Sequence, residues 1–283
     1  MNAPSTRSVG AAALLALWGR ELTRVVRQPT RLVAAIATPI LLWVVLASGF
    51  ADSIAPPVRT DAGDAGLGYG AFLLPGIITL TVTFTSIFGA ISLIEDRHRG
   101  LLQGVLASPA PAWAIAGSKL LGAATVATAQ GAILLLAAYT VGMRPGSLEL
   151  LMALAGVLLV SLGIAGVALA AAWRVDSVHG FHSVMNLVLM PMWLLSGSAF
   201  PIDGAAGWMG AIMRANPLAW ATGAVRGALV GEFHVLTWIG GVAFAALGVG
   251  LAVAVLGRRV RPPNRHRASA RTTVMREVRG GQA

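Results

Sequence analysis

Apolar residues dominate six long stretches of the chain that contain no Asp, Glu, Lys or Arg. A membrane-spanning helix rises about 1.5 Å per residue and needs about 20 apolar residues to cross a hydrocarbon core of about 30 Å. Each stretch reaches or approaches this length, so the pattern predicts six transmembrane helices. The stretches are Leu32–Phe50, Tyr69–Ile94, Leu120–Met143, Leu150–Trp173, Ser183–Phe200 and Val235–Gly257.

The composition supports an all-α polytopic membrane protein. Of the 283 residues, 56% are hydrophobic and 11% are charged, whereas charged residues make up about 25% of a typical soluble domain. A soluble domain of this length cannot bury so much apolar surface, which excludes ordinary soluble and disordered proteins. We therefore expect a transmembrane domain over residues 31–257. The chain contains no Cys, which also excludes disulfides, Cys-ligated zinc and thiol catalysis.

The first 30 residues predict a cytoplasmic tail followed by an amphipathic helix. Apolar residues interleave here with Arg20, Arg24 and Arg27, and no signal-peptide cleavage site follows. We expect this helix to lie on the membrane surface, with its arginines facing lipid phosphates and Trp18 in the headgroup layer. Gln28-Pro29 then ends the helix before the first span.

The distribution of charge predicts the orientation. The net charge is +10, and 17 of the 21 basic residues lie in the N-terminal segment, in residues 95–119 and 174–182, or in the tail after Gly257. The positive-inside rule places these segments in the cytoplasm. Both termini are then cytoplasmic, as six spans require, and residues 258–283 form a basic cytoplasmic tail that we expect to be disordered.

The segment Ile202–Gly231 is apolar but is interrupted by Arg214, Asn216-Pro217 and Arg226. Its pieces are too short to cross a membrane. We therefore expect two short helices on the extracellular side, at the surface or dipping in beside the bundle.

The predicted spans contain no ionisable side chain of the Asp, Glu, Lys or Arg type. Proton- and sodium-coupled carriers and voltage sensors usually need such groups in the membrane, so their absence argues against self-powered transport. The chain's single lysine, Lys119, follows Gly117-Ser118 without the glycine spacing of a phosphate-binding loop. We expect no cofactor in this chain, so ATP and Mg would be bound by a separate polypeptide. An ion- or proton-coupled carrier or channel is the alternative.

An enzyme is the third possibility, because Asp176, His179 and His182 have the spacing of a loose metal-binding triad. Gly180 interrupts any helix there and no second cluster supports the triad. The segment is therefore more typical of a solvated connector with a helix-capping Asp.

The loop between the second and third spans carries an apolar stripe at helical spacing, flanked by charge and ended by proline. Either this segment rests on lipid, or it presents an apolar ridge to a groove on a cytoplasmic partner. The residues that would carry such coupling are Glu95, Arg97, Arg99, Gly100, Leu101, Leu102, Val105, Leu106 and Pro109.

One face of the second span carries small and hydroxyl side chains, namely Gly76, Thr79, Thr83 and Ser86. They could line a substrate path, but such residues more often permit close helix packing, with hydroxyl groups bonding their own backbone. Asn186 in the fifth span and Gln130 in the third leave the same two interpretations open, because a buried amide needs a partner.

Several short motifs, in this order, resemble the permease subunits of type-2 ABC exporters, which include drug-resistance and polysaccharide or Nod-factor exporters. The resemblance covers nearly the whole chain. The motifs are Arg27-Gln28-Pro29, the run from Tyr69 to Gly76 (YGAFLLPG), the loop from Glu95 to Pro109, the run from Ser196 to Ile202 (SGSAFPI), and Asn216-Pro217-Leu218-Ala219-Trp220 followed by Arg226.

The resemblance implies a cell-membrane subunit of six spans that pairs with a second permease copy and sits on two cytoplasmic ABC ATPase subunits. The surface helix and residues 95–109 would dock on those ATPases, and the short helices between spans five and six would shape the outer end of the pathway. The substrate would be an amphiphilic drug, lipid or saccharide, and the other partners membrane lipids rather than nucleic acid.

Overall fold

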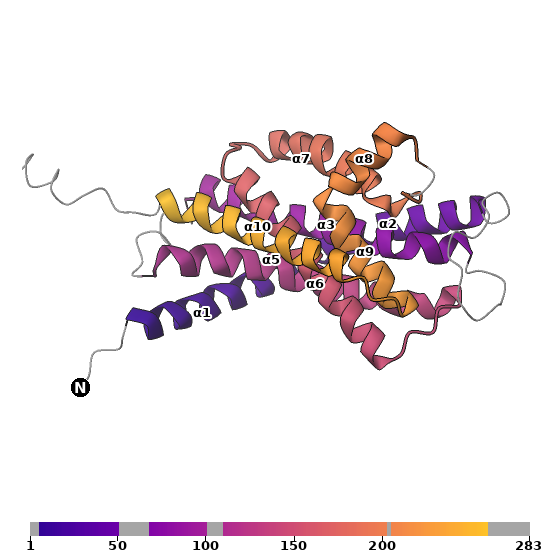
Figure 1. Cartoon of the computed structure of the whole chain (residues 1–283). Helices are drawn as coiled ribbons and strands as arrows, with labels where there is room; N and C mark the ends of the chain where they lie inside the picture. The colour runs from indigo at the N-terminus through magenta and orange to yellow at the C-terminus, as the bar shows by residue number, and fades with distance from the viewer. Residues whose placement is uncertain (1–5, 51–67, 101–109, 203–204, 260–283) are drawn as a thin grey trace, which may run out of the picture.

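The computed structural model describes residues 6–50, 68–100, 110–202 and 205–259, and within them every regular element is helical (Figure 1). The first half contains α1 (Thr6–Val26), α2 (Pro29–Gly49), α3 (Tyr69–His98), α5 (Ala112–Leu135) and the short continuation η1 (Leu136–Val141). The second half contains α6 (Ser147–Ala172), α7 (Val178–Trp193), η2 (Leu194–Ser198), α8 (Gly207–Ala215), α9 (Pro217–Val230) and α10 (Val235–Arg259).

Six of these helices are long and apolar enough to cross a membrane, which confirms the predicted all-α bundle of six spans. Each spanning helix extends beyond the stretch expected from hydropathy at one end, and two of these extensions bring in charged residues that pair with each other. The second span continues to His98 and the third begins at Ala112, so Glu95, Asp96 and Lys119 are helical residues rather than parts of a loop. The predicted stretches themselves contain no charged residue, but the helices that continue them do, and opposite charges pair at this end of the bundle.

The core of the bundle surrounds α3, the most buried of the six spanning helices, while α2 and α7 are the least buried. Side chains around the whole circumference of α3, such as Leu73, Leu74 and Ile77, are excluded from solvent. Helices α2, α5, α6 and α7 all pack against it. In Figure 1, α1 lies below α5 at the left end of the bundle, and α7 and α8 lie along the top.

Glycine residues set the closest helix crossing, between α6 and α10. A Cβ atom added at Gly166 would lie 2.2 Å from the backbone of Gly248, and one added at Gly248 would lie 2.4 Å from the carbonyl oxygen of Gly163. Small residues at such crossings let the two backbones approach closely. In lipid the hydrophobic effect does not drive helices together, so this close van der Waals packing is a main source of the energy of helix association.

The C-terminal end of α7 is kinked and is held against α3. Pro191 removes one helical hydrogen bond, and Gly197 adopts a left-handed conformation with φ +74° within η2. The indole of Trp193 donates to the carbonyl of Gly76 at 2.7 Å, and the hydroxyl of Tyr69 donates to the carbonyl of Ala199 at 2.8 Å. The kinked end of α7 is thus tied to the first half of α3.

Two short helices lie between the fifth and sixth spans, as expected, but their environments differ. Helix α8 exposes Trp208 and Ile212, whereas α9 is mostly buried and packs against α6 and α10. From α9, the guanidinium of Arg226 donates to the carbonyls of Phe72 at 3.3 Å and Gly197 at 2.8 Å. Helix α9 therefore dips in beside the bundle and closes on the kink of α7.

Candidate functional site

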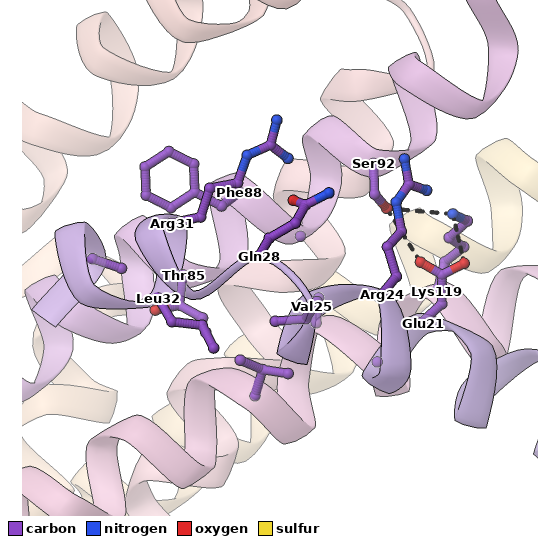
Figure 2. Close-up of a pocket in the computed structure, with 15 residues that line it drawn as sticks. Glu21, Arg24, Val25, Gln28, Arg31, Leu32, Thr85, Phe88, Ser92 and Lys119 are labelled. Carbon is purple, nitrogen blue, oxygen red and sulfur yellow. Dashed lines mark hydrogen bonds and ion pairs between the residues drawn. The ribbon is translucent and has the colours of Figure 1, made fainter. Parts of the chain in front are cut away.

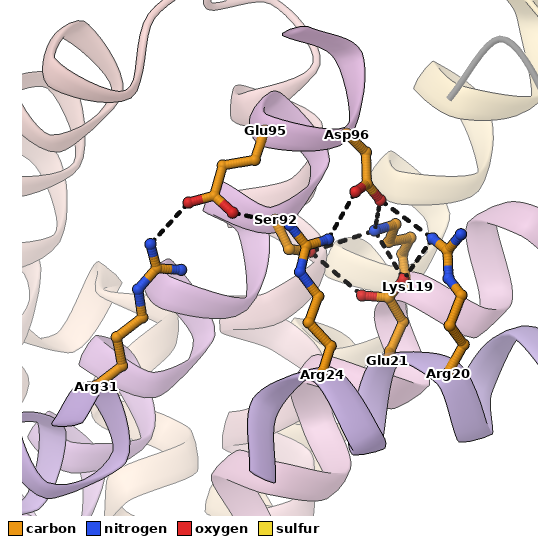
Figure 3. Close-up of polar contacts among 8 residues, drawn as sticks. All are labelled: Arg20, Glu21, Arg24, Arg31, Ser92, Glu95, Asp96 and Lys119. Carbon is orange, nitrogen blue, oxygen red and sulfur yellow. Dashed lines mark hydrogen bonds and ion pairs between the residues drawn. The ribbon is translucent and has the colours of Figure 1, made fainter. Parts of the chain in front are cut away.

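Four helices bring seven charged side chains together at one end of the bundle, which we call the charged end. Helix α1 contributes three of them, α2 and α5 one each, and the last turn of α3 two (Figure 3). This charged cluster consists of Arg20, Glu21, Arg24, Arg31, Glu95, Asp96 and Lys119.

Asp96 is the centre of the charged cluster. Its buried carboxylate accepts from Arg24 at 2.6 Å, from Arg20 at 3.2 Å, and from the ammonium group of Lys119. Lys119 is buried too and forms a second ion pair with Glu21 at 2.8 Å. The desolvation cost of a buried ion is offset when its partners are close and its hydrogen bonds are satisfied, and each of these groups meets both conditions.

Glu95 joins the two N-terminal helices across the Gln28-Pro29 junction. Its carboxylate accepts from Arg24 of α1 at 2.8 Å and from Arg31 of α2 at 2.7 Å. Burial lowers the pKa of Arg24, but the neighbouring carboxylates of Asp96, Glu21 and Glu95 outweigh that effect, so its pKa lies above the usual value. Because Glu95 pairs with Arg24 and Arg31 together, it holds α1 and α2 at a defined angle where the chain enters the first span.

Helix α1 packs along α5 rather than resting only on lipid. Gly117 and Gly122 of α5 face Leu14 and Glu21, and a Cβ atom at Gly122 would lie 2.8 Å from the Cβ of Glu21. The indole of Trp18 donates to the hydroxyl of Thr125 at 3.3 Å.

The expectation that the arginines of this helix face lipid phosphates is therefore wrong for Arg20 and Arg24, which bind carboxylates of the same chain. Arg27 is exposed. Glu21 is the neighbour of Arg20 in the same helix, but the other two acidic partners, Glu95 and Asp96, lie 71 to 76 residues away along the chain, so the sequence of the helix does not reveal them.

Arg97, the next residue of α3, reaches the end of α6. Its guanidinium donates to the carbonyls of Ala172 (3.2 Å), Trp173 (2.9 Å) and Val175 (3.2 Å), and it pairs with the exposed carboxylate of Asp176 at 3.1 Å. It also lies over the indole of Trp173, 5.3 Å from the ring centroid.

The possible metal triad is not assembled. The carboxylate of Asp176 binds Arg97, while His182 lies edge-on to the ring of Phe88, with centroids 6.0 Å apart. His179 is exposed. Across the described ranges, no group of three His, Asp or Glu side chains has the arrangement of a metal site.

The expected coupling residues divide into two groups. Glu95 and Arg97 belong to the last turn of α3, Arg99 caps it, and Gly100 ends it in a left-handed conformation with φ +71°. The residues of the apolar stripe and the proline that ends it lie outside the described part of the chain, namely Leu101, Leu102, Val105, Leu106 and Pro109.

A cavity lies next to the charged cluster, between α1, α2, α3 and α5 (Figure 2). It is lined by charged groups such as Arg24 and Lys119 and by apolar groups such as Leu32 and Phe88. Its volume of about 40 Å³ accommodates one or two water molecules, since a water occupies about 30 Å³.

The small and hydroxyl residues of α3 lie inside the monomer. Thr79 meets Thr222 of α9 at 3.2 Å, the hydroxyl of Thr83 donates to the carbonyl of Thr79 at 2.8 Å, and a Cβ atom at Gly76 would lie 2.6 Å from Ser198. The hydroxyl of Ser86 is buried, with no hydrogen-bond partner within the described residues. These contacts favour helix packing over the lining of a path.

The two amides differ. Gln130 is buried between Thr85, which donates to it, and the carbonyl of Leu32 at 3.4 Å. Asn186, expected to be buried, is instead exposed on the outer face of α7. Hydropathy fixes the span but not which face of it turns outward, so this expectation was wrong.

Residues 12–230 match the model of the ABC-2 type transporter family. The chain belongs to this family. Nodulation protein J of Rhizobium meliloti is 28% identical to this permease over 232 residues, which cover 80% of this chain and 86% of that protein. The putative transport permease ycf38 of Porphyra purpurea is 29% identical over 217 residues, covering 75% of this chain and 72% of that protein.

The probable multidrug ABC transporter permease YbhR of Escherichia coli (strain K12) is 30% identical to the permease over 159 residues, covering 54% of this chain and 42% of that protein. Membership of the family identifies the chain as a multi-pass transmembrane transport subunit of an ABC transporter, a type of subunit that is generally not catalytic itself and that associates with ABC ATPase subunits.

Sequence reasoning missed the charged cluster as an assembled unit. It identified Glu95 and Arg97 as functional, but as residues that face a partner rather than other helices of the permease. It gave no role to Glu21, Asp96 or Lys119. The signal available was a lysine within an apolar run that begins at Ala112, because such a residue needs a nearby carboxylate if the run is a membrane helix.

Proposed function

We propose that the permease is the membrane subunit of an ATP-driven exporter, and that separate ABC ATPase subunits bind at its charged end, on the cytoplasmic side. The observation that carries the proposal is the charged cluster. It joins α1, α2, α3 and α5 within one turn of the point where α3 ends, so a displacement applied there acts on three spanning helices together.

Charge supports this orientation. Most of the basic residues lie on the side that carries the charged end, which the positive-inside rule assigns to the cytoplasm. Residues 101–109 follow α3 directly, and in the proposal the apolar ridge formed by Leu101, Leu102 and Leu106 docks on the ATPase.

The substrate is an amphiphilic compound of the drug, lipid or saccharide class, and its path forms between two copies of the permease. Two observations support this location. Thr79 and Thr83 of α3 make their contacts within one copy, and the cavity beside the charged cluster has a volume of only about 40 Å³. In the proposal, a path wide enough for an amphiphile therefore lies between two copies.

The test is to purify the permease together with an ABC ATPase subunit from the same organism that co-purifies with it, and to measure ATP hydrolysis in phosphatidylethanolamine–phosphatidylglycerol vesicles. Leu102→Asp puts a charge on the ridge, so we expect it to abolish permease-dependent hydrolysis while membrane insertion stays normal. The matched control is Leu148→Asp, which puts the same charge on an exposed leucine in the first turn of α6. Hydrolysis in Leu102→Asp equal to that of the wild type contradicts the proposal.

The second candidate is an ion-coupled carrier, and one observation favours it. Lys119, Asp96 and Glu21 are buried ionisable groups, two of them within spanning helices, and such groups often carry protons in membrane transporters. Uphill transport by the permease alone under an imposed proton gradient would support this candidate and not the exporter.

A further inference from the structure

We infer that Arg97 is a positioning residue that makes the start of α7 follow the end of α3. This inference rests on the proposed function, because it describes how a displacement applied by an ATPase at the charged end spreads through the permease. It assigns to Arg97 a role within the chain, in place of the partner-facing role predicted from the sequence.

The geometry of Arg97 is that of a helix cap supplied by another helix. The last carbonyl groups of an α-helix have no partner within that helix. Arg97 donates to the carbonyls of Ala172, Trp173 and Val175, and its guanidinium stacks on the indole of Trp173. A planar fork with five donors can satisfy several carbonyls at once, whereas the ammonium group of lysine is a point charge.

The neighbours of Arg97 anchor the other end of the connection. Glu95 is paired with arginines of α1 and α2, Asp96 with α1 and α5, and the ring of His98 meets the carbonyl of Asp176 at 2.6 Å. Four consecutive residues thus tie the last turn of α3 to four other helices. Among them, Arg97 and His98 connect α3 with the segment that joins α6 to α7.

That segment, residues 173–177, determines where α7 begins. Ser177 caps α7, its hydroxyl accepting from the amide of Gly180 at 3.0 Å, so the helix starts directly after the residues that Arg97 holds. Helix α7 packs mainly against α3 and its own kinked end and contacts α6 little. Residues 173–177 are therefore a main constraint on the first turn of α7.

The far end of α7 transmits a shift to the outer half of the bundle. The indole of Trp193 binds the carbonyl of Gly76, and the amide nitrogen of Asn216 donates to the carbonyl of Met192 at 2.6 Å. A displacement of α7 along its axis thus reaches α3 and the junction of α8 and α9. Besides α3 itself, a second route from the charged end to the outer half thus runs through Arg97 and α7.

Hydrogen exchange of the permease–ATPase complex tests the inference. Amide exchange is measured by mass spectrometry without nucleotide and with ATP and vanadate, in the wild type and in Arg97→Gln. In the wild type we expect trapping to change exchange in residues 92–98 and in residues 178–185. In Arg97→Gln we expect the change in residues 92–98 to persist and the change in residues 178–185 to be lost. A purely structural role would raise exchange in both states and leave the difference between them intact.

The matched control is Asp176→Asn, which removes the exposed ion pair of Arg97 but leaves its three carbonyl bonds, so the nucleotide-dependent change at residues 178–185 should remain. If Arg97→Gln does not fold, Arg97→Lys decides alone, and a change equal to that of the wild type overturns the inference. A wild-type complex with no nucleotide-dependent change in residues 92–98 instead contradicts the proposed function.

Discussion

The substitution Lys119→Met tests how much a buried ion pair of the charged cluster contributes to the stability of the permease. The ammonium group of Lys119 is 4% exposed and pairs with Glu21 and Asp96. Removing one partner of a buried ion pair costs about 3–5 kcal/mol, because the remaining charge is left uncompensated. Here Asp96 keeps Arg24 at 2.6 Å and Glu21 keeps Arg20 at 3.0 Å, so we expect the lower limit, about 3 kcal/mol.

The matched control is Arg20→Gln. Arg20 binds the same two carboxylates, at 3.0 and 3.2 Å, but its side chain is 41% exposed, and exposed ion pairs contribute about 0–1 kcal/mol. At about 2–4 °C per kcal/mol, Lys119→Met should lower the apparent melting temperature by about 6–12 °C and Arg20→Gln by at most about 4 °C.

The assay is the loss of monodisperse protein on heating in mild detergent, followed by size-exclusion chromatography. Adding Glu21→Gln to Lys119→Met should cost less than the sum of the two single changes, because both act on one ion pair. Equal melting temperatures for Lys119→Met and the wild type, or an Arg20→Gln effect as large as that of Lys119→Met, would refute the description of Asp96 as a buried centre.

Three further changes test other parts of the structure. Gly166→Ala would place a Cβ atom 2.2 Å from the backbone of α10 and should destabilise the permease by about 1–3 kcal/mol in the same heating assay, whereas Gly250→Ala, with no atom within 4 Å of the added Cβ, should not. A topology reporter fused after Gly207 should show that this position lies outside the cell, and one fused after Ser269 should show a cytoplasmic position. The reverse pattern would contradict the predicted orientation of the permease in the membrane. His179→Ala should leave ATP hydrolysis by the complex unchanged, and a tenfold loss would instead revive the metal-enzyme alternative.

The membrane explains why the spans could be predicted from the sequence. A helix in lipid must carry about 20 apolar residues with its own backbone satisfied, and that requirement is visible in each of the six stretches. The same reasoning failed at the charged end. Helices α3 and α5 extend through Asp96 and Lys119 because these residues neutralise each other, and the two residues lie 23 positions apart.

In the candidate site, too, some features could be predicted from the sequence and others could not. The sequence indicated that Glu95 and Arg97 matter, since both belong to the segment with a family-like pattern between the second and third apolar stretches. It could not show what they bind, because Glu95 meets residues 64 and 71 positions away and Arg97 meets carbonyl groups 75 to 78 positions away. Backbone carbonyls in particular leave no trace in a pattern of side chains.

The most direct test of the central claim is to reconstitute the permease in vesicles with and without its ABC ATPase, with ATP supplied on the side of the membrane where the charged end lies. Ethidium would serve as the amphiphilic probe, and a proton gradient and a sodium gradient would be imposed in turn. The permease alone should neither hydrolyse ATP nor accumulate ethidium against its gradient under either ion gradient, and the complex should hydrolyse ATP at a rate that depends on the permease. Sustained uphill movement of ethidium by the permease alone would show that it has a power source of its own and would contradict the account.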